Sequence, residues 1–197
     1  MKKQKIEINK NFILSSAYEE YKYLIEFMNC KGNYNTPGIS DYPFYAYFST
    51  LVNNTTILEI GTSEGGSATM MSHNQTNKII SYDVIKHDSV PDSNLRGINF
   101  RIGNFLEDEI DYDKIDLITI DAAHNGNDEI KMVEHLSKNW KGGLLFLDDI
   151  NLSPMRGFWE GIDRDVHEVF DISDIAHGHH GSGLVNFNRY FDITIVE

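Results

Sequence analysis

A run of small and acidic residues in the first third of the chain has the composition of a ligand-binding turn. The preceding segment Ile57–Ile60 is apolar with β-branched ends, which predicts a buried strand, and a helix is predicted to begin near Ser67. Between them lie Gly61, Thr62, Ser63, Glu64, Gly65 and Gly66. Glycines let the backbone approach a ligand, and the unpaired N–H groups of a helix start face it. The stretch predicts either a nucleotide-binding turn or a tight strand-to-helix turn that binds nothing.

The spacing of the glycines distinguishes between nucleotides. A dinucleotide fingerprint requires G-x-G-x-x-G, whereas Ser63 stands where its second glycine would be. The pattern E-x-G-x-x-x-G, formed by Glu59, Gly61 and Gly65, instead resembles motif I of the class I S-adenosylmethionine (SAM) methyltransferases. This resemblance implies that Glu59 and Gly61 border the methionine part of SAM. It also implies that Thr62, Ser63, Gly65 and Ser67 belong to the cofactor site.

Acidic or amide residues follow most of the other predicted strands. These strands are predicted at Lys78–Asp83, Ile98–Ile102, Ile115–Ile120 and Gly143–Leu147. Parallel strands bring their carboxyl ends to one edge of a sheet, where ligands bind. Asp83 is therefore placed to accept hydrogen bonds from both ribose hydroxyls, although it would also suit the nicotinamide ribose of a dehydrogenase. Asn104, or the backbone beside Phe105, is placed for the adenine, and Asp121 adjoins the same cofactor site.

Three aspartates, Asp121, Asp148 and Asp149, form a second group at this edge. Converging carboxylates repel unless they are protonated or bind a cation, and oxygen-only ligands favour Mg²⁺ or Mn²⁺. The segments that carry them resemble the metal-binding strand ends of catechol-type and of macrolide- or sugar-type O-methyltransferases. Catechol-type enzymes usually carry Asp-Asn, so the Asp148–Asp149 pair looks more like the sugar and macrolide branch.

His124 follows Asp121 by three positions. In the catechol-type relatives a lysine at that offset is the general base, so the resemblance implies His124 and Asp121 as the catalytic pair. A histidine is the commonest general base, but it is also a common loop residue. The residues equally allow His124 to cap the helix that follows it.

A histidine-rich segment, His177–His180, precedes the last predicted strand of the sheet. Its composition allows a metal site, but we interpret it as a flexible hairpin loop because glycines surround the histidines. In this fold class the loop lies on the ligand side, so one of its histidines is placed to touch a substrate.

Strands alternate with helices along most of the chain. Helices are predicted from a capping box at Ser16–Glu19 to about Asn29, and at Tyr42–Val52, Asn127–Asn139 and Ser153 to about Val166. A sixth strand is predicted at Val169–Ile172, and Gly183–Phe187 is preferred over Phe191–Val196 as the antiparallel seventh. We expect an α/β, Rossmann-like class I methyltransferase fold: a seven-stranded, mostly parallel sheet with helices on both faces. Residues 1–14 are expected to be a lead-in within an N-terminal helical lid of residues 1–52, packed on a catalytic core of residues 53–197.

Composition limits the class of protein. The 197 residues are 41% hydrophobic and 24% charged, as in one globular domain. A net charge of −13 argues against a nucleic-acid partner, and no stretch approaches the ~20 apolar residues of a membrane span. The single cysteine, Cys30, cannot form an internal disulfide, and no apolar run follows the basic start Met1–Lys5. We therefore expect a cytoplasmic protein.

The resemblance implies a SAM-dependent O-methyltransferase assisted by Mg²⁺ or Mn²⁺. Its acceptor would be a hydroxyl of a small molecule such as a vicinal-diol sugar, a macrolide or a phenol, and a homodimer is possible. Two alternatives stay open: a metal-independent methyltransferase that uses Asp121 and His124 as the acid–base pair, and a SAM- or nucleotide-binding module without turnover.

Overall fold

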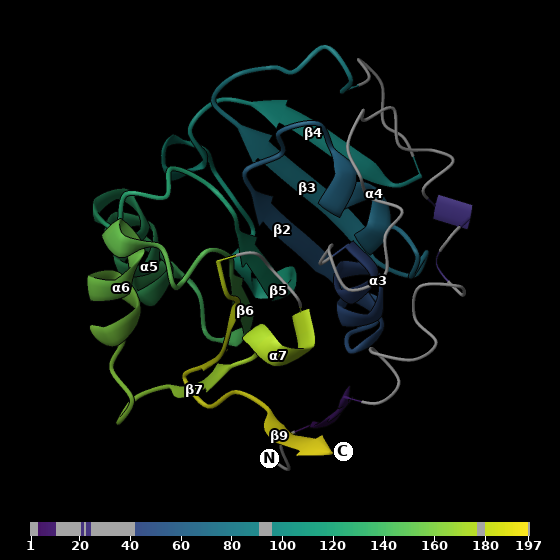
Figure 1. Ribbon diagram of the computed structural model, residues 1–197. Helices are drawn as coiled ribbons and strands as arrows, with labels where there is room; N and C mark the ends of the chain where they lie inside the picture. Colours follow the sequence, from purple (N-terminus) through teal and green to yellow (C-terminus); the bar gives the residue numbers. More distant parts are fainter. Residues whose placement is uncertain are drawn as a thin grey trace.

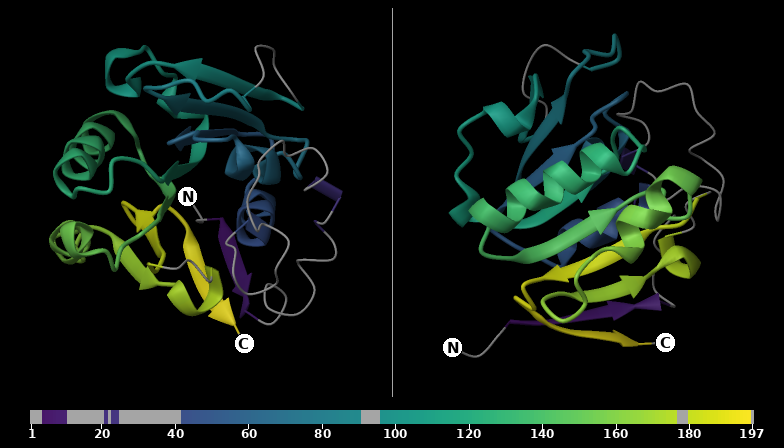
Figure 2. Two further views of the ribbon diagram at one scale, coloured as in Figure 1. Left: turned by 45° about the horizontal axis from the view of Figure 1, so that its top comes forward. Right: turned by 90° about the vertical axis from the view of Figure 1, so that its left-hand side faces the viewer.

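The computed structural model describes residues 4–10, 21, 23–24, 42–90, 96–176 and 180–196. A twisted sheet forms its centre, with helices on both sides (Figures 1 and 2). The segments next to the two chain ends lie side by side as parallel strands at one end of the molecule (Figures 1 and 2).

The central sheet has seven strands in the order β4-β3-β2-β5-β6-β8-β7. The strands are β2 (Thr56–Ile60), β3 (Lys78–Asp83), β4 (Ile98–Ile102), β5 (Ile115–Ile120), β6 (Gly143–Leu147), β7 (Glu168–Asp171) and β8 (Gly183–Phe187). Strands β2 to β6 pair in parallel, whereas β8 runs antiparallel to both β6 and β7. The predicted α/β fold is confirmed, as is the choice of Gly183–Phe187 as the antiparallel strand.

Two hydrophobic layers hold the sheet between its helices. On one face lie α3 (Tyr42–Thr50), α4 (Gly66–Met71) and α7 (Ser173–Ala176), and on the other α5 (Asn127–Asn139) and α6 (Ser153–Glu160). Two short 3₁₀ turns, η1 (Phe105–Glu107) and η2 (Tyr112–Lys114), flank the second face. Strands β2, β5, β6 and β8 are covered on both faces and almost continuously buried, and their many apolar residues made them recognisable in the sequence.

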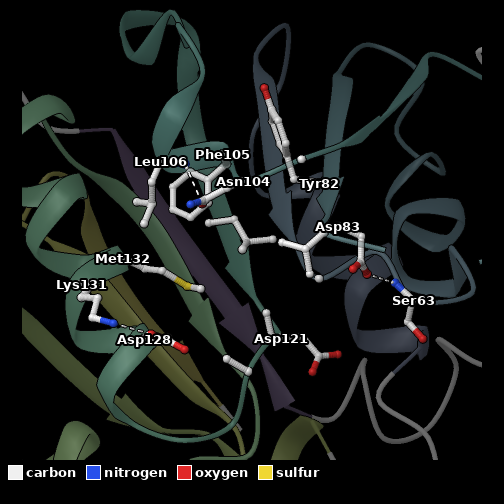
Figure 3. Close-up of a pocket in the computed structure, with 16 residues that line it drawn as sticks. Ser63, Tyr82, Asp83, Asn104, Phe105, Leu106, Asp121, Asp128, Lys131 and Met132 are labelled. Carbon is white, nitrogen blue, oxygen red and sulfur yellow. Dashed lines mark hydrogen bonds and ion pairs between the residues drawn. The ribbon is translucent and has the colours of Figure 1, made fainter. Parts of the chain in front are cut away.

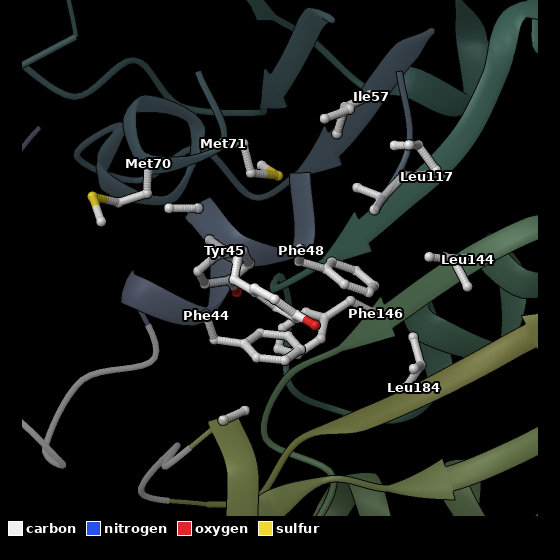
Figure 4. Packing of buried hydrophobic residues seen from close by; sticks show 14 of the residues in the cluster. Phe44, Tyr45, Phe48, Ile57, Met70, Met71, Leu117, Leu144, Phe146 and Leu184 are labelled. Atoms are coloured by element: carbon white, nitrogen blue, oxygen red, sulfur yellow. The ribbon is translucent and has the colours of Figure 1, made fainter. Parts of the chain in front are cut away.

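The first layer is centred on Phe146 of β6 (Figure 4). Its ring centroid lies 5.3 Å from that of Phe44, 5.1 Å from that of Tyr45 and 5.8 Å from that of Phe48. Three aromatic side chains of α3 therefore fix this helix on the sheet, beside α4 and the turn that precedes α4.

The chain ends pair in a way that the local sequence pattern did not indicate. Strand β1 (Lys5–Asn9) lies parallel to β9 (Asp192–Val196) in a separate two-stranded sheet, with Lys5 opposite Asp192. The predicted lead-in therefore contains a strand, and the second strand-like C-terminal segment pairs with it instead of joining the central sheet.

Helix α6 is shorter than predicted. It ends at Glu160, whereas the sequence pattern extended it to about Val166. The Oδ1 atom of Asp163 accepts hydrogen bonds from the backbone N–H groups of Asp165, at 2.9 Å, and Val166, at 3.3 Å. This side chain holds the backbone in a turn, so no further helical turn forms.

The N-terminal region is described only in part. Tyr21 and Leu24, which share a face of the predicted first helix, are both buried in the first hydrophobic layer. The capping box at Ser16–Glu19, Cys30 and the predicted loop of residues 32–41 lie outside the described residues. Within the described ranges, no helix has both the length and the apolar character needed to cross a membrane.

Candidate active site

A cavity of about 490 Å³ opens at the carboxyl ends of the parallel strands (Figure 3). Its walls come from the segments after β2, β3, β4 and β5 and from the first turns of α5. Of the predicted site residues, the lining includes Gly61, Ser63, Asp83, Asn104, Phe105 and Asp121. The structure thus brings together side chains from four strands, at the edge where the sequence placed them.

The floor of the cavity depends on a glycine. Gly61 adopts φ +101°, and a Cβ atom at this position would lie 1.8 Å from the carbonyl oxygen of Asp121. The backbone continues the sheet here, since Gly61 N donates to Tyr82 O and Asp121 N donates to Ile60 O, both at 2.9 Å. Only glycine permits this approach between the ends of β2 and β5.

Glu59 lies beneath the turn and is 1% exposed. Its carboxylate accepts hydrogen bonds from the hydroxyls of Ser67 in α4 and Ser81 in β3, and Thr62 Oγ1 lies 2.5 Å from Ser81 Oγ. Burial raises the pKa of Glu59 to about 7, although the two serine hydroxyls oppose this shift. Glu59, Thr62 and Ser67 therefore join β2, β3 and α4 under the cavity; Ser81 belongs to this network and was missed by the sequence analysis.

Asp83 is fixed at the cavity rim by backbone groups. Its Oδ2 accepts the N–H of Ser63 at 2.8 Å, and its Oδ1 accepts the N–H of Ile85 at 3.1 Å. A carboxylate oxygen has room for a second hydrogen bond, so both oxygens can still accept from a ligand. The carboxylate is thus oriented by the protein's own backbone.

The side chain of Asn104 makes hydrogen bonds within the turn that follows β4. Its Oδ1 accepts the N–H of Leu106 at 3.1 Å, and its Nδ2 donates to Glu107 Oε1 at 3.1 Å. The wall at this end of the cavity is formed by the backbone and by the apolar side chains of Phe105 and Leu106. Of the two predicted adenine contacts, the one beside Phe105 is therefore the better placed.

His124 lies between two aspartates. Its Nε2 is 3.5 Å from Asp121 Oδ1 and its Nδ1 is 3.2 Å from Asp149 Oδ2. Ala123 and His124 have φ values of 61° and 51°, and Asp149 has 58°. Such left-handed backbone costs about 1–2 kcal/mol per non-glycine residue and tends to be retained at functional sites.

Glu129 holds the loop that carries His124, and the sequence analysis missed it. This fully buried carboxylate accepts the N–H of His124 at 2.8 Å and that of Gly126 at 2.7 Å. A glycine at the N-cap with a glutamate three positions later is a capping-box spacing, so the sequence did contain a signal.

The described side chains do not form the predicted three-aspartate metal cage. Asp148 turns toward Ser182, whose hydroxyl donates to Asp148 Oδ1 at 3.2 Å, and the imidazole of His124 separates Asp121 from Asp149. Burial, followed by the charge of Asp149, raises the pKa of Asp148. Among the residues described, no group of three potential ligands is arranged to hold a metal ion.

The described end of the histidine-rich loop, which starts at His180, lies beside this group of aspartates. Ile150 N donates to Gly181 O at 3.1 Å, and Asn151 N donates to His180 O at 2.7 Å. His180 is exposed, whereas His177 and His179 lie outside the described residues. The end of the loop is therefore held close to Asp149, on the ligand side.

The fold is shared with solved methyltransferases of low sequence similarity. An O-methyltransferase from Bacillus cereus, in complex with S-adenosylhomocysteine (SAH), matches with a TM-score of 0.58 at 17% identity, over 88% of this chain and 91% of its own. A SAH-bound methyltransferase from Podospora anserina gives 0.56 at 14% identity, over 87% and 88%. A SAM-dependent O-methyltransferase from Thermotoga maritima gives 0.55 at 12% identity, over 83% and 70%.

Sequence comparison adds no relative, since no protein-family model and no curated protein sequence matches this chain. At these identities the structural similarity establishes the fold, which is the Rossmann-like fold of the class I methyltransferases.

The buried Glu59 predicts a pH-dependent stability. Its pKa is about 7 in the folded chain and about 4.5 when unfolded, so the folded state retains a proton that the unfolded state loses. The associated stability is present below pH 4.5 and is lost as the pH rises through 7, a change on the order of 3 kcal/mol. Urea unfolding from pH 5 to 8 should show this fall in the wild type and lack it in Glu59→Gln. The exposed Glu134→Gln is the control; parallel curves for the wild type and Glu59→Gln would contradict the assignment.

Proposed function

We propose that the protein is a SAM-dependent O-methyltransferase that acts on a hydroxyl group of a small molecule. One observation carries the proposal: three backbone N–H groups of the glycine-rich turn already donate within the protein. Ser63 N donates to Asp83, Gly65 N donates to Thr62 O at 2.7 Å, and Gly61 N donates to Tyr82 O. A pyrophosphate would need such N–H groups, whereas a nucleoside joined to an amino acid does not.

The chemistry of the cavity supports the same ligand. Asp83 offers two oriented oxygens to a ribose, and Phe105, Leu106 and Met132 offer apolar surface to an adenine. The solved structures of similar fold include methyltransferases bound to SAH. These features favour SAM over the runner-up ligand, a nicotinamide dinucleotide.

The acceptor end of the site lies at Asp121, which lines the cavity. SAM supplies an electrophilic methyl group on its sulfonium. His124 Nε2, on the side of Asp121, takes the proton of the acceptor hydroxyl, and the carboxylate of Asp149 lies 3.2 Å from Nδ1 on the other side of the ring. The protein then contributes orientation of the acceptor oxygen and exclusion of water. The proton leaves His124 to solvent after the reaction.

Metal assistance is the second version of this proposal. The sequence resemblance favours it, but the side chains of Asp121, Asp148 and Asp149 diverge around His124 and Ser182. The geometry therefore supports the metal-independent version better. A SAM-binding module without turnover is the alternative if no acceptor is methylated.

The remaining parts of the proposal come from the sequence. The acceptor is a sugar, macrolide or phenol, residues 1–52 form a lid over it, and the protein acts in the cytoplasm as a monomer or homodimer. The buried positions of Tyr21 and Leu24 support packing of that region on the core.

The first test is nucleoside binding. SAH should bind in calorimetry, and Asp83→Ala should weaken it at least tenfold, because a hydrogen bond to a charged group contributes about 1.5–3 kcal/mol. The exposed Asp88→Ala on the following loop should bind like the wild type. Equal affinity of wild type and Asp83→Ala would refute the ribose assignment. Binding of NADH in place of SAH would assign the protein to the dehydrogenases.

The second test concerns His124. With an acceptor identified from a panel of sugars, macrolides and phenols, His124→Ala should lower turnover by ~10²–10⁴-fold, since a general base is lost. SAH affinity should stay unchanged, because the ribose site lies on other strands. His180→Ala serves as the comparison. If His124→Ala keeps the wild-type rate and pH profile, the base is a water molecule or a histidine of the neighbouring loop.

The third test is metal removal. If His124 and Asp149 suffice, turnover should survive EDTA within about twofold, because the proton is then taken without a Lewis acid. In calorimetry, Asp148→Ala should leave the response of the protein to Mn²⁺ the same as in the wild type. Loss of turnover in EDTA with recovery in Mg²⁺ or Mn²⁺ would establish the metal-assisted version instead.

A further inference from the structure

One wall of the cavity is a short loop that packing alone does not hold. Residues 103–108 follow β4, and Asn104, Phe105 and Leu106 among them face the cavity (Figure 3). A second hollow, of about 440 Å³, lies along the same loop and is lined by Arg101, Asn104, Glu107 and Asp108 among others. Phe105 anchors the start of the loop, since it is 2% exposed and packed in the second hydrophobic layer, whereas the far end borders the outer hollow and depends on polar contacts for its position.

Those contacts converge at the far end of the loop, on Asp108. The hydroxyl of Tyr82 donates to Asp108 Oδ2 at 2.5 Å and accepts from Arg101 Nη1 at 2.7 Å. Arg101 Nη1 also donates to Asp108 Oδ2 at 2.9 Å. The three groups form a closed triangle, which we call the Tyr82 clamp.

The clamp joins the loop to the two strands that carry the site. Tyr82 and Arg101 are register partners on β3 and β4, and Tyr82 directly precedes Asp83. Tyr82 is 3% exposed and lines both the cavity and the outer hollow. Its ring centroid lies 6.4 Å from that of Phe105, so the same residue touches the loop at its apolar side.

Charge strengthens the triangle. The guanidinium carbon of Arg101 lies 5.5 Å from the centre of the Tyr82 ring, and the contacts with Tyr82 and Arg101 lower the pKa of Asp108. Because hydrogen bonds to charged groups are stronger than neutral ones, an exposed loop end can be fixed here without burial.

We propose that Tyr82, Arg101 and Asp108 are positioning residues that preset the adenine wall of the cavity. This inference rests on the proposed function, since it assigns the adenosyl part of SAM to that wall. A fixed wall avoids the entropy of ordering the loop on binding, so breaking the clamp weakens every ligand that carries the adenosyl group. It leaves the contacts of the amino-acid part unchanged.

Calorimetry with two probes tests the proposal. SAH carries the adenosyl and amino-acid parts, and 5′-deoxy-5′-methylthioadenosine carries the adenosyl part alone. Tyr82→Phe removes the hydroxyl only, and it should weaken both probes by about tenfold. Asp108→Asn keeps an oxygen that accepts from the Tyr82 hydroxyl, and it should stay within about threefold of the wild type. Tyr190→Phe, which removes a hydroxyl from the segment between β8 and β9 that does not line the cavity, is the matched control and should change neither affinity.

Three outcomes overturn the clamp: wild-type affinity of a folded Tyr82→Phe for both probes, a loss confined to SAH, or an equal loss in Tyr190→Phe. If Tyr82→Phe does not fold, Asp108→Ala gives the same test from the exposed side of the triangle and should also lose about tenfold. Failure of the wild type to bind either probe would instead refute the proposed function.

Discussion

The close approach of Gly61 to Asp121 determines where the cavity of this protein lies. Because the backbone of the glycine lies against the Asp121 carbonyl, the end of β2 and the end of β5 meet without a side chain between them. The cavity therefore opens between the turn after β2 and the loop after β5. Asp83 lines one side of it and Asp121 lines another, with His124 Nε2 3.5 Å from the carboxylate of Asp121.

The two ends of the site are built in different ways. At the end that we propose for the nucleoside, backbone N–H groups orient Asp83, and the buried Glu59 network supports the turn from below. At the end that we propose for the acceptor, Glu129 holds a left-handed loop that places His124 between Asp121 and Asp149. The first arrangement suits the proposed binding of a ribose. The second suits the proposed removal of a proton from the acceptor hydroxyl.

The sequence predicted the strands of the central sheet well because they are apolar and covered on both faces. It also predicted which strand ends meet, since parallel strands share one edge. It did not predict the pairing of β1 with β9, which joins residues from opposite ends of the chain and leaves no local pattern. The directions of individual side chains could not be predicted either. The Asn104 side chain accepts from Leu106 N in the same turn, and Asp148 accepts from the hydroxyl of Ser182.

A crystal structure of the protein grown with SAH tests the central claim most directly. The account predicts density in the cavity between Gly61 and Phe105, with both ribose hydroxyls on the carboxylate of Asp83 and the sulfur close to Asp121. An empty cavity at saturating SAH, or SAH bound elsewhere with Asp83 still turned only to Ser63 and Ile85, would contradict it.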